Sequence, residues 1–270
     1  MGPSGRGRCR WEAAVPVRSS AAEPFAHDGT SGTGVLLCHG FTSTPQSMRD
    51  WAEHLAAADF TVRCPLLPGH GTSWRDLNRT KWTDWYAAVA RSLDELRSSC
   101  RSVFVFGQSM GGTLTLRLAE QNPDIAGIVL VNPSVTTLRR GAALLPVLCR
   151  VLPRLPGIPG DIAKPGSEEI AYRWLPLKAM ASLQQLWKIV RQDLHRIEQP
   201  VLLFRSAVDH IVEPVNSEIV LTGVRSTDSA EVVLPNSYHV ATLDHDAPEI
   251  FRLSAEFIQR VLQRTAEETA

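Results

Sequence analysis

Residues 103–121 read VFVFGQSMGGTLTLRLAEQ, a stretch that contains three successive structural signals. The apolar run at residues 103–106 predicts a buried strand, and the periodicity of residues 113–120 predicts a helix. Between them, residues 107–111 form a GxSxG motif around Ser109. A strand, a sharp turn and a helix in this order form a nucleophile elbow, in which glycines make room for a strained, exposed serine. The stretch therefore predicts Ser109 as a nucleophile, and the alternative is a merely structural glycine turn.

Further short apolar runs are spread along the chain, each bounded by glycine, proline or polar residues. They lie at residues 35–38, 61–64, 128–131, 201–204 and 232–234. Runs without alternation are typical of strands that are buried on both faces, and the helical stretches between them provide the crossovers that parallel strands require. We therefore expect an α/β fold, with a mostly parallel central sheet and helices on both of its faces.

The segment between the runs that end at residue 131 and begin at residue 201 is too long for a plain loop. Its first part is apolar, basic and interrupted by prolines, and helical patterns follow at residues 167–174 and 178–194. We interpret residues from about 134 to 195 as a small cap over the carboxyl edge of the sheet, where open α/β sheets bind ligands.

Residues 144–155 of this insertion are rich in leucine, and basic side chains accompany them. The basic residues are Arg139, Arg140, Arg150 and Arg154. Two interpretations are open, namely a surface that makes transient contact with a lipid interface, or the buried underside of the cap. Of the two, we favour burial.

Composition restricts the domain organisation, the partners and the location. Residues 1–21 have no hydrophobic period, so we expect a disordered leader followed by a single domain at residues 22–265. Basic and acidic residues both total 28, and the resulting formal net charge of zero argues against a nucleic-acid partner. Five single cysteines suit a reducing compartment, and no apolar stretch has the form of a signal peptide or a spanning helix. We expect a soluble, cytoplasmic protein, and its oligomeric state stays open.

A serine nucleophile needs a base, and the base needs an orienting acid, in the chain order Ser, Asp or Glu, His for a nucleophile elbow of this kind. Asp209 is the first acid after the run at residues 201–204, with Glu213 as its nearest rival. His239 lies between the run that ends at residue 234 and the last helical stretch. We predict Asp209 as the acid and His239 as the base, because His210 adjoins the acid itself and His245 is expected in the first turn of the last helix.

The tetrahedral intermediate of acyl transfer needs two hydrogen-bond donors for its oxyanion. We expect them to be the backbone N–H groups of Met110, which follows the nucleophile, and of Phe41, in the loop after residues 35–38. His39 in that loop is expected to brace it rather than to react. The sequence has no HExxH, CxxC, P-loop or GxGxxG motif, so we expect no metal and no cofactor.

From about residue 22 to residue 260 the chain resembles the bacterial monoacylglycerol lipase and small carboxylesterase family of the α/β-hydrolase superfamily. The stretches that carry the resemblance are LLCHGFTSTP at 36–45, PGHGT at 68–72, QSMGGTLTL at 108–116 and NSYHVATLD at 236–244. The resemblance implies a mobile cap, a triad of Ser109, Asp209 and His239, an oxyanion hole at Phe41 and Met110, and monoacylglycerols or simple esters as substrates. Residues 139–160 contain more Pro, Leu and Arg than the family's cap, which leaves the acyl-chain preference open.

Glu169 is a candidate to bind glycerol hydroxyls, because a pocket that selects a diol needs a polar partner among apolar walls. The alternative is a solvated acid in the first turn of a helix. We expect hydrolysis of monoacylglycerols to glycerol and fatty acid through an acyl-enzyme on Ser109. Other esters, lysophospholipids, peptides and thioesters, or acyl transfer to an alcohol, would use the same machinery, and a non-catalytic receptor is a further alternative.

Overall fold

The computed structural model describes residues 22–158 and 160–269, so the predicted leader at residues 1–21 lies outside the described residues. In the described ranges the main sheet has seven strands in the order β1-β3-β2-β4-β5-β8-β9. Neighbouring strands are parallel except for β1 and β3, which pair antiparallel. The strands are β1 (Phe25–His27), β2 (Thr33–Cys38), β3 (Thr61–Cys64), β4 (Ser102–Gln108), β5 (Gly127–Val131), β8 (Val201–Ser206) and β9 (Ser229–Leu234).

Six of these strands coincide with the predicted apolar runs, which confirms the α/β fold with a mostly parallel sheet. Strand β1 was not predicted, because a strand of three partly exposed residues has no recognisable period. The last helix, α8 (Ala247–Thr269), also runs past the predicted domain end at residue 265.

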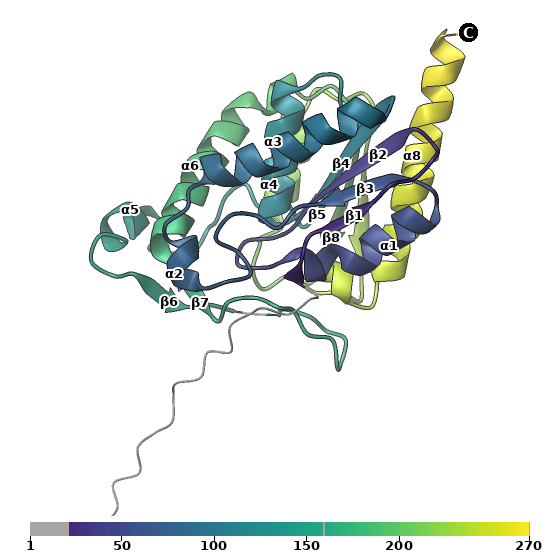
Figure 1. The fold of residues 1–270 in the computed structure, drawn as a ribbon. Coiled ribbons are helices and arrows are strands. Elements are labelled where there is room, and N and C mark those ends of the chain that lie inside the picture. Colours follow the sequence, from purple (N-terminus) through teal and green to yellow (C-terminus); the bar gives the residue numbers. More distant parts are fainter. Residues whose placement is uncertain (1–21, 159, 270) are drawn as a thin grey trace, which may run out of the picture.

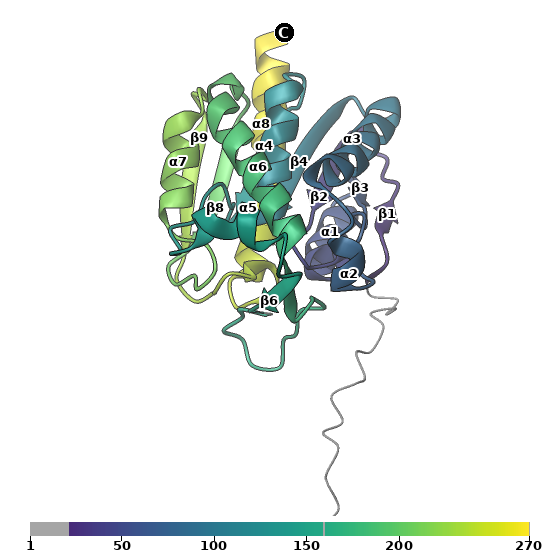
Figure 2. The ribbon, with the colours of Figure 1, turned by 90° about the vertical axis from the view of Figure 1, so that its left-hand side faces the viewer.

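Helices cover both faces of the sheet (Figures 1 and 2). One face packs against α1 (Arg49–Ala57) and α8, and the other packs against α3 (Trp82–Ser99), α4 (Met110–Gln121) and α6 (Leu177–Asp193). Successive strand residues enter different cores: Leu36 faces α3 and α4, whereas Leu37 faces α1 and α8. Both are fully buried, which explains why the strands show continuous apolar runs instead of alternation.

Shorter elements complete the fold. The helix α7 (Val215–Gly223) contacts α6, and α2 (Trp74–Leu77) contacts the cap strand β7. The 3-10 helices are η2 (Pro45–Met48), η3 (Ala142–Leu144), η4 (Leu194–Arg196) and η5 (Ala241–Leu243).

The insertion between β5 and β8 forms the cap at the carboxyl edge of the sheet (Figure 2). It contains η3, α5 (Leu145–Leu148), the antiparallel pair β6 (Arg154–Pro156) and β7 (Trp174–Pro176), and α6. The predicted helix at residues 178–194 is confirmed as α6, but the one at 167–174 is wrong. Backbone groups there bond to the core instead: Ile170 donates to the side chain of Gln46, and Tyr172 donates to the carbonyl of Thr42.

The favoured burial of the leucine-rich cap segment is also wrong. Leu145 is buried, but Val147 and Val151 are 64% and 76% exposed, and other apolar side chains of the segment are exposed with them. The segment forms α5, a turn and the start of β6 at the rim of the molecule (Figure 1), where α5 contacts α6 but the side chains of Val147 and Val151 stay exposed.

Helix α4 starts directly after β4 and packs closely against β2, and two glycines make this approach possible. A Cβ atom on Gly111 would collide with the carbonyl oxygen of Cys38 in β2, and one on Gly107 would collide with the backbone of Gly111. Neither collision can be relieved by turning a side chain, because the opposing atoms belong to the backbone. The two glycines of the GxSxG motif therefore set the distance between α4 and the sheet.

Replacing Gly111 with alanine should lower the free energy of unfolding by about 1–3 kcal/mol or more, because the added methyl group overpacks a backbone contact. Thermal and urea unfolding measure this loss. The matched control is Gly157→Ala in the cap, where a Cβ atom would make contacts no closer than 3.4 Å. Equal stability of the two variants would contradict the packing role of Gly111.

Candidate active site

Ser109 occupies the turn between β4 and α4 with φ 55° and ψ −117°, a region that non-glycine residues rarely adopt. Neighbouring backbone holds it there: its N–H donates to the carbonyl of Val131 (2.9 Å), and its carbonyl accepts from the N–H of Ser134 (3.2 Å). Such a conformation costs on the order of 1–3 kcal/mol and persists only when the surroundings determine it. The turn is the strained elbow that the GxSxG motif predicted.

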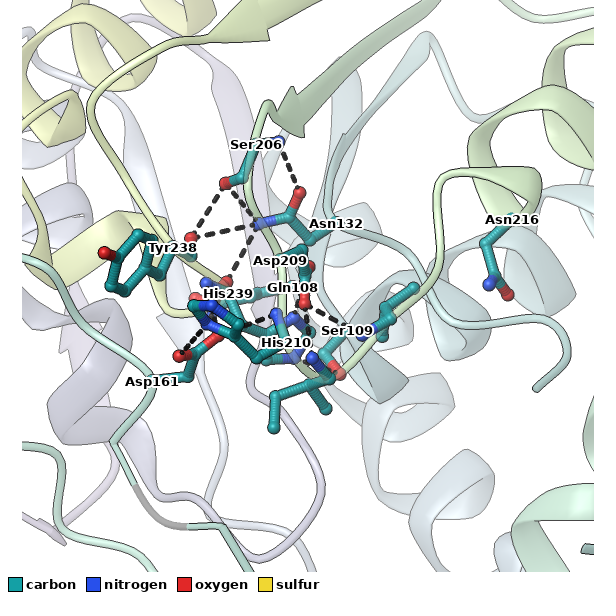
Figure 3. Close-up of polar contacts among 12 residues, drawn as sticks. Gln108, Ser109, Asn132, Asp161, Ser206, Asp209, His210, Asn216, Tyr238 and His239 are labelled. Carbon is teal, nitrogen blue, oxygen red and sulfur yellow. Dashed lines mark hydrogen bonds and ion pairs between the residues drawn. The ribbon is translucent and has the colours of Figure 1, made fainter. Parts of the chain in front are cut away.

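The side chains of Ser109, His239 and Asp209 form one chain of hydrogen bonds (Figure 3). Nε2 of His239 lies 3.0 Å from Oγ of Ser109, and Nδ1 of His239 lies 2.8 Å from Oδ2 of Asp209. They come from the loops after β4, β9 and β8, which all end at the same edge of the sheet. The structure thus brings together the three predicted residues, with Nδ1 of His239 against the carboxylate and Nε2 facing the serine hydroxyl.

The rival residues lie elsewhere. Glu213 accepts hydrogen bonds from the hydroxyl of Thr137 and the N–H of Leu138, at the start of the cap. The ring of His210 bonds to Asp161 at 2.8 Å, and His245 precedes α8. None of the three bonds to Ser109.

Electrostatics favour charge separation within the chain of hydrogen bonds. Burial raises the pKa of Asp209, but attraction to His239 and the N–H groups of Val212 and Ile211 outweigh it, so its pKa is lowered. Burial lowers the pKa of His239, but the carboxylates of Asp209, Glu169 and Asp161 outweigh that effect, so its pKa is raised. The site therefore stabilises an imidazolium next to a carboxylate, which is the state that forms when histidine takes the serine proton.

The loop after β2 lies beside Ser109. A Cβ atom on Gly40 would lie 3.7 Å from Cβ of Ser109, and Phe41 lines the same cavity as Ser109. Met110 is the first residue of α4, so its N–H has no carbonyl partner within the helix. Of the two residues predicted as donors, Met110 therefore directly follows Ser109 and Phe41 lines the same cavity.

His39 braces this loop, as expected. Its Nε2 accepts from the N–H of Leu67 (3.2 Å), so its Nδ1 carries the proton and faces the carbonyl of Gly40 (3.0 Å). Burial lowers the pKa of His39 to about 4 despite this bond to Gly40, so the ring is neutral.

Asn132, the residue after β5, contacts the loop of His239, and the sequence did not predict this contact. Its φ is 44°, and its amide nitrogen donates to the carbonyl of His239 (2.9 Å) and to Oγ of Ser206 (2.9 Å). Its amide oxygen accepts from the N–H of Ser206 (2.8 Å), so one side chain ties three strand ends together (Figure 3). The signal in the sequence is an asparagine, a residue that tolerates positive φ, directly after a buried strand.

A cavity of about 460 Å³ opens beside Ser109 and His239, between the sheet edge and the cap. One wall is apolar and is formed mainly by α5 and α6 of the cap, with Leu145, Leu148, Leu177, Met180, Leu183 and Trp187. Glu169 contributes a carboxylate to the lining, and its Oε2 accepts from the N–H of Gly160 (3.3 Å). Burial raises the pKa of Glu169, and because residues 167–174 are not helical, it is not an acid in the first turn of a helix.

Within residues 22–158 and 160–269 there is no cluster of three or more His, Cys, Asp or Glu side chains that could hold a metal ion. In the same ranges no helix has the length and apolar character needed to cross a membrane.

Comparisons with known proteins agree with this geometry. The family model described as serine aminopeptidase, S33, matches residues 31–246. A thermostable monoacylglycerol lipase of Bacillus sp. (strain H-257) is 44% identical over 250 residues, which cover 91% of this chain and 97% of that protein. A carboxylesterase of Bacillus subtilis (strain 168) is 26% identical over 88% of this chain and 97% of that protein.

Solved structures show the same fold. A structure of the metagenome-derived lipolytic enzymes LipS and LipT superposes with a TM-score of 0.86 at 38% identity, covering 89% of this chain and 98% of that one. A monoacylglycerol lipase of Paleococcus ferrophilus superposes with a TM-score of 0.74 at 22% identity over 88% of this chain and 98% of that one. The elbow, the cap and these matches together show that the chain is a serine hydrolase of the monoacylglycerol lipase and carboxylesterase family, within the α/β-hydrolase superfamily.

Proposed function

We propose that the chain hydrolyses carboxylic esters, with monoacylglycerols as its main substrates, and that Ser109, His239 and Asp209 are its catalytic triad. The observation that carries the proposal is the continuous hydrogen-bonded path from Asp209 through His239 to Ser109, which ends in the apolar cavity. The relatives described as a monoacylglycerol lipase and a carboxylesterase support the substrate class.

In the proposed reaction, Oγ of Ser109 attacks the ester carbonyl while Nε2 of His239 takes its proton. Asp209 stabilises the imidazolium, and the N–H groups of Phe41 and Met110 stabilise the oxyanion. His239 then protonates the leaving alcohol. Water attacks the acyl group on Ser109 by the same route in reverse, which releases the fatty acid and restores the serine.

The lining of the cavity offers separate surfaces for the acyl chain and for the glycerol head group. The side chains of Leu145, Leu183 and Trp187 offer apolar surface to an acyl chain. Glu169 offers a carboxylate that can accept hydrogen bonds from glycerol hydroxyls, as a pocket selective for a diol requires. The volume of about 460 Å³ falls within the range of about 300–1,000 Å³ usual for small-molecule sites.

We also propose that the protein is located in the cytoplasm. Cys38, Cys64, Cys100 and Cys149 are all free thiols, which suits a reducing compartment. Burial raises the pKa of Cys38 to about 12, although the hydroxyl of Thr115 opposes the shift, so this thiol is unreactive.

The first experiment measures hydrolysis of monoacylglycerols, diacylglycerols and p-nitrophenyl esters of matched chain length by the native chain and by Ser109→Ala. We expect turnover with preference for monoacylglycerol, and a loss of at least about 10³-fold in Ser109→Ala, since the nucleophile is removed. Aminoacyl p-nitroanilides test the peptidase alternative that the family description raises. Faster cleavage of anilides than of esters, or full activity in Ser109→Ala, would contradict the proposal.

Replacing Glu169 with glutamine should lower kcat/KM for a monoacylglycerol about tenfold, the value of one hydrogen bond to a charged group. At the pH optimum the p-nitrophenyl ester with the same acyl chain should be affected little, because it has no glycerol hydroxyls. The matched control is Glu168→Gln at the exposed neighbouring residue. Equal losses on both substrates would assign Glu169 a role other than recognition of the head group.

We further propose that the exposed apolar residues of the cap contact the surface of dispersed lipid. These residues, the cap patch, are Leu144, Val147, Val151, Leu152, Leu155 and Ile158. Four arginines and no acidic residue lie within residues 138–158, so the segment can also approach anionic head groups.

The double substitution Val147→Ser and Val151→Ser should reduce activity on monoacylglycerol in vesicles several-fold and leave a soluble short-chain ester unchanged. Sedimentation with vesicles measures the accompanying loss of binding. The control is Val233→Ser, which removes a similarly exposed valine (46%) on β9. Unchanged vesicle activity in the double variant would rule out the cap patch as the contact surface.

A further inference from the structure

A single carboxylate of the cap contacts both loops that carry the acid and the base. Oδ2 of Asp161 accepts hydrogen bonds from the backbone N–H of His239 (3.2 Å) and of His210 (3.1 Å), the residue after Asp209. Its Oδ1 bonds to the ring of His210 (2.8 Å), and its carbonyl accepts from the N–H of Val240 (3.0 Å). Asp161 is only 9% exposed, and Figure 3 shows it beside the rings of His210 and His239.

We propose that Asp161 is a positioning residue for the reaction, a carboxylate through which the cap sets the separation of the Asp209 and His239 loops. The inference rests on the proposed function, since it assigns Asp161 a role toward the proposed acid and base. No motif in the sequence marks this residue. With this role for Asp161, the cap would not only enclose the substrate but also hold the triad in its geometry.

The geometry makes the carboxylate a bridge. Two N–H groups from different loops converge on one oxygen atom, so a larger separation of the loops weakens at least one charge-assisted hydrogen bond. The peptide of His239 is held from the other side as well, because its carbonyl accepts from Asn132 (2.9 Å) and Gln108 (3.4 Å). Removing the Asp161 side chain would leave the hydrogen bonds of the His239 carbonyl in place, but the His239 N–H would lose its bond to Asp161.

The ring of His210 completes the arrangement. It packs edge-on against Tyr238, with ring centroids 4.7 Å apart and planes at 83°. Tyr238 is the residue before His239. The ring of His210, which bonds to Asp161, therefore also packs against the loop of the base. His210, which we did not expect to be the base, therefore connects the cap to the triad loops.

The negative charge of Asp161 provides a second readout. The groups that face His239 are Asp209 from the loop after β8, Glu169 and Asp161 from the cap, and Ser109 from the elbow. Burial lowers the pKa of His239, and the three carboxylates raise it. Removing the charge at position 161 should lower this pKa. Because the base must be neutral to act, the acid limb of kcat/KM should then move to lower pH.

The test compares Asp161→Ala, Asp161→Asn and a matched control with the native chain on p-nitrophenyl acetate, a small soluble ester. The control is Asn78→Ala, which removes bonds between α2 and the cap backbone at Pro153, Lys178 and Ala179, remote from the triad loops. Asp161→Ala should lower kcat on the order of 10–100-fold, with KM within about twofold, because small displacements of catalytic groups are costly.

The asparagine variant separates geometry from charge. The amide oxygen can accept both backbone N–H groups, and the amide N–H can donate to His210, so most of kcat should return at the pH optimum. The acid limb should nevertheless shift to lower pH. Asn78→Ala should retain both kcat and the native acid limb.

A kcat within about twofold of native in Asp161→Ala, or an equal loss in Asn78→Ala, would overturn the proposal. If Asp161→Ala does not fold, the pH profile of Asp161→Asn decides, and an unshifted acid limb would then count against it. Absence of ester turnover in the native chain would instead refute the proposed function, so the two failures are distinguishable.

Discussion

The close contact between α4 and β2 is the constraint on which the site depends. Gly111 allows the first turn of α4 to lie against the carbonyl of Cys38, and the turn that leads into this helix holds Ser109 in a backbone conformation with φ 55°. From this turn Oγ of Ser109 lies 3.0 Å from Nε2 of His239, and Ser109 lines the cavity. The strain is held by hydrogen bonds to neighbouring strand ends, so the fold and the nucleophile are parts of one arrangement.

The parallel sheet then supplies the remaining groups at the same edge. Strands β2, β4, β5, β8 and β9 all end there, and each is followed within a few residues by a polar or backbone group of the site. The cap covers this edge of the sheet. It contributes the apolar wall of the cavity, the carboxylate of Glu169 and, through Asp161, two hydrogen bonds to the loops of the acid and base.

Much of this arrangement could be predicted from the sequence, because it depends on residues that are close together in the chain. The elbow is encoded by five consecutive residues, and the buried strands by continuous apolar runs. Asp209 and His239 follow from chain order, since parallel strands place their carboxyl ends together. Asn132 and Asp161 could not be found this way, because their roles depend on contacts to residues 239 and 210 that are distant in the chain.

The cap was the least predictable part. An apolar, leucine-rich segment normally indicates burial, but at the rim of the molecule no described element covers residues such as Val151. A helical pattern at residues 167–174 failed because the backbone there bonds to Gln46 and Thr42 across the cap boundary. The first error follows from the position of the segment at the rim, and the second follows from contacts to residues that are distant in the chain.

Whether Ser109 is the activated nucleophile is tested most directly by covalent trapping with an alkyl p-nitrophenyl phosphonate. Phosphonylation should release one equivalent of p-nitrophenol, and peptide mass spectrometry should locate a single adduct at Ser109. His239→Ala should slow the labelling by orders of magnitude, because the serine then lacks its base. An adduct at another residue, or native labelling rates without His239, would contradict the assignment of the triad.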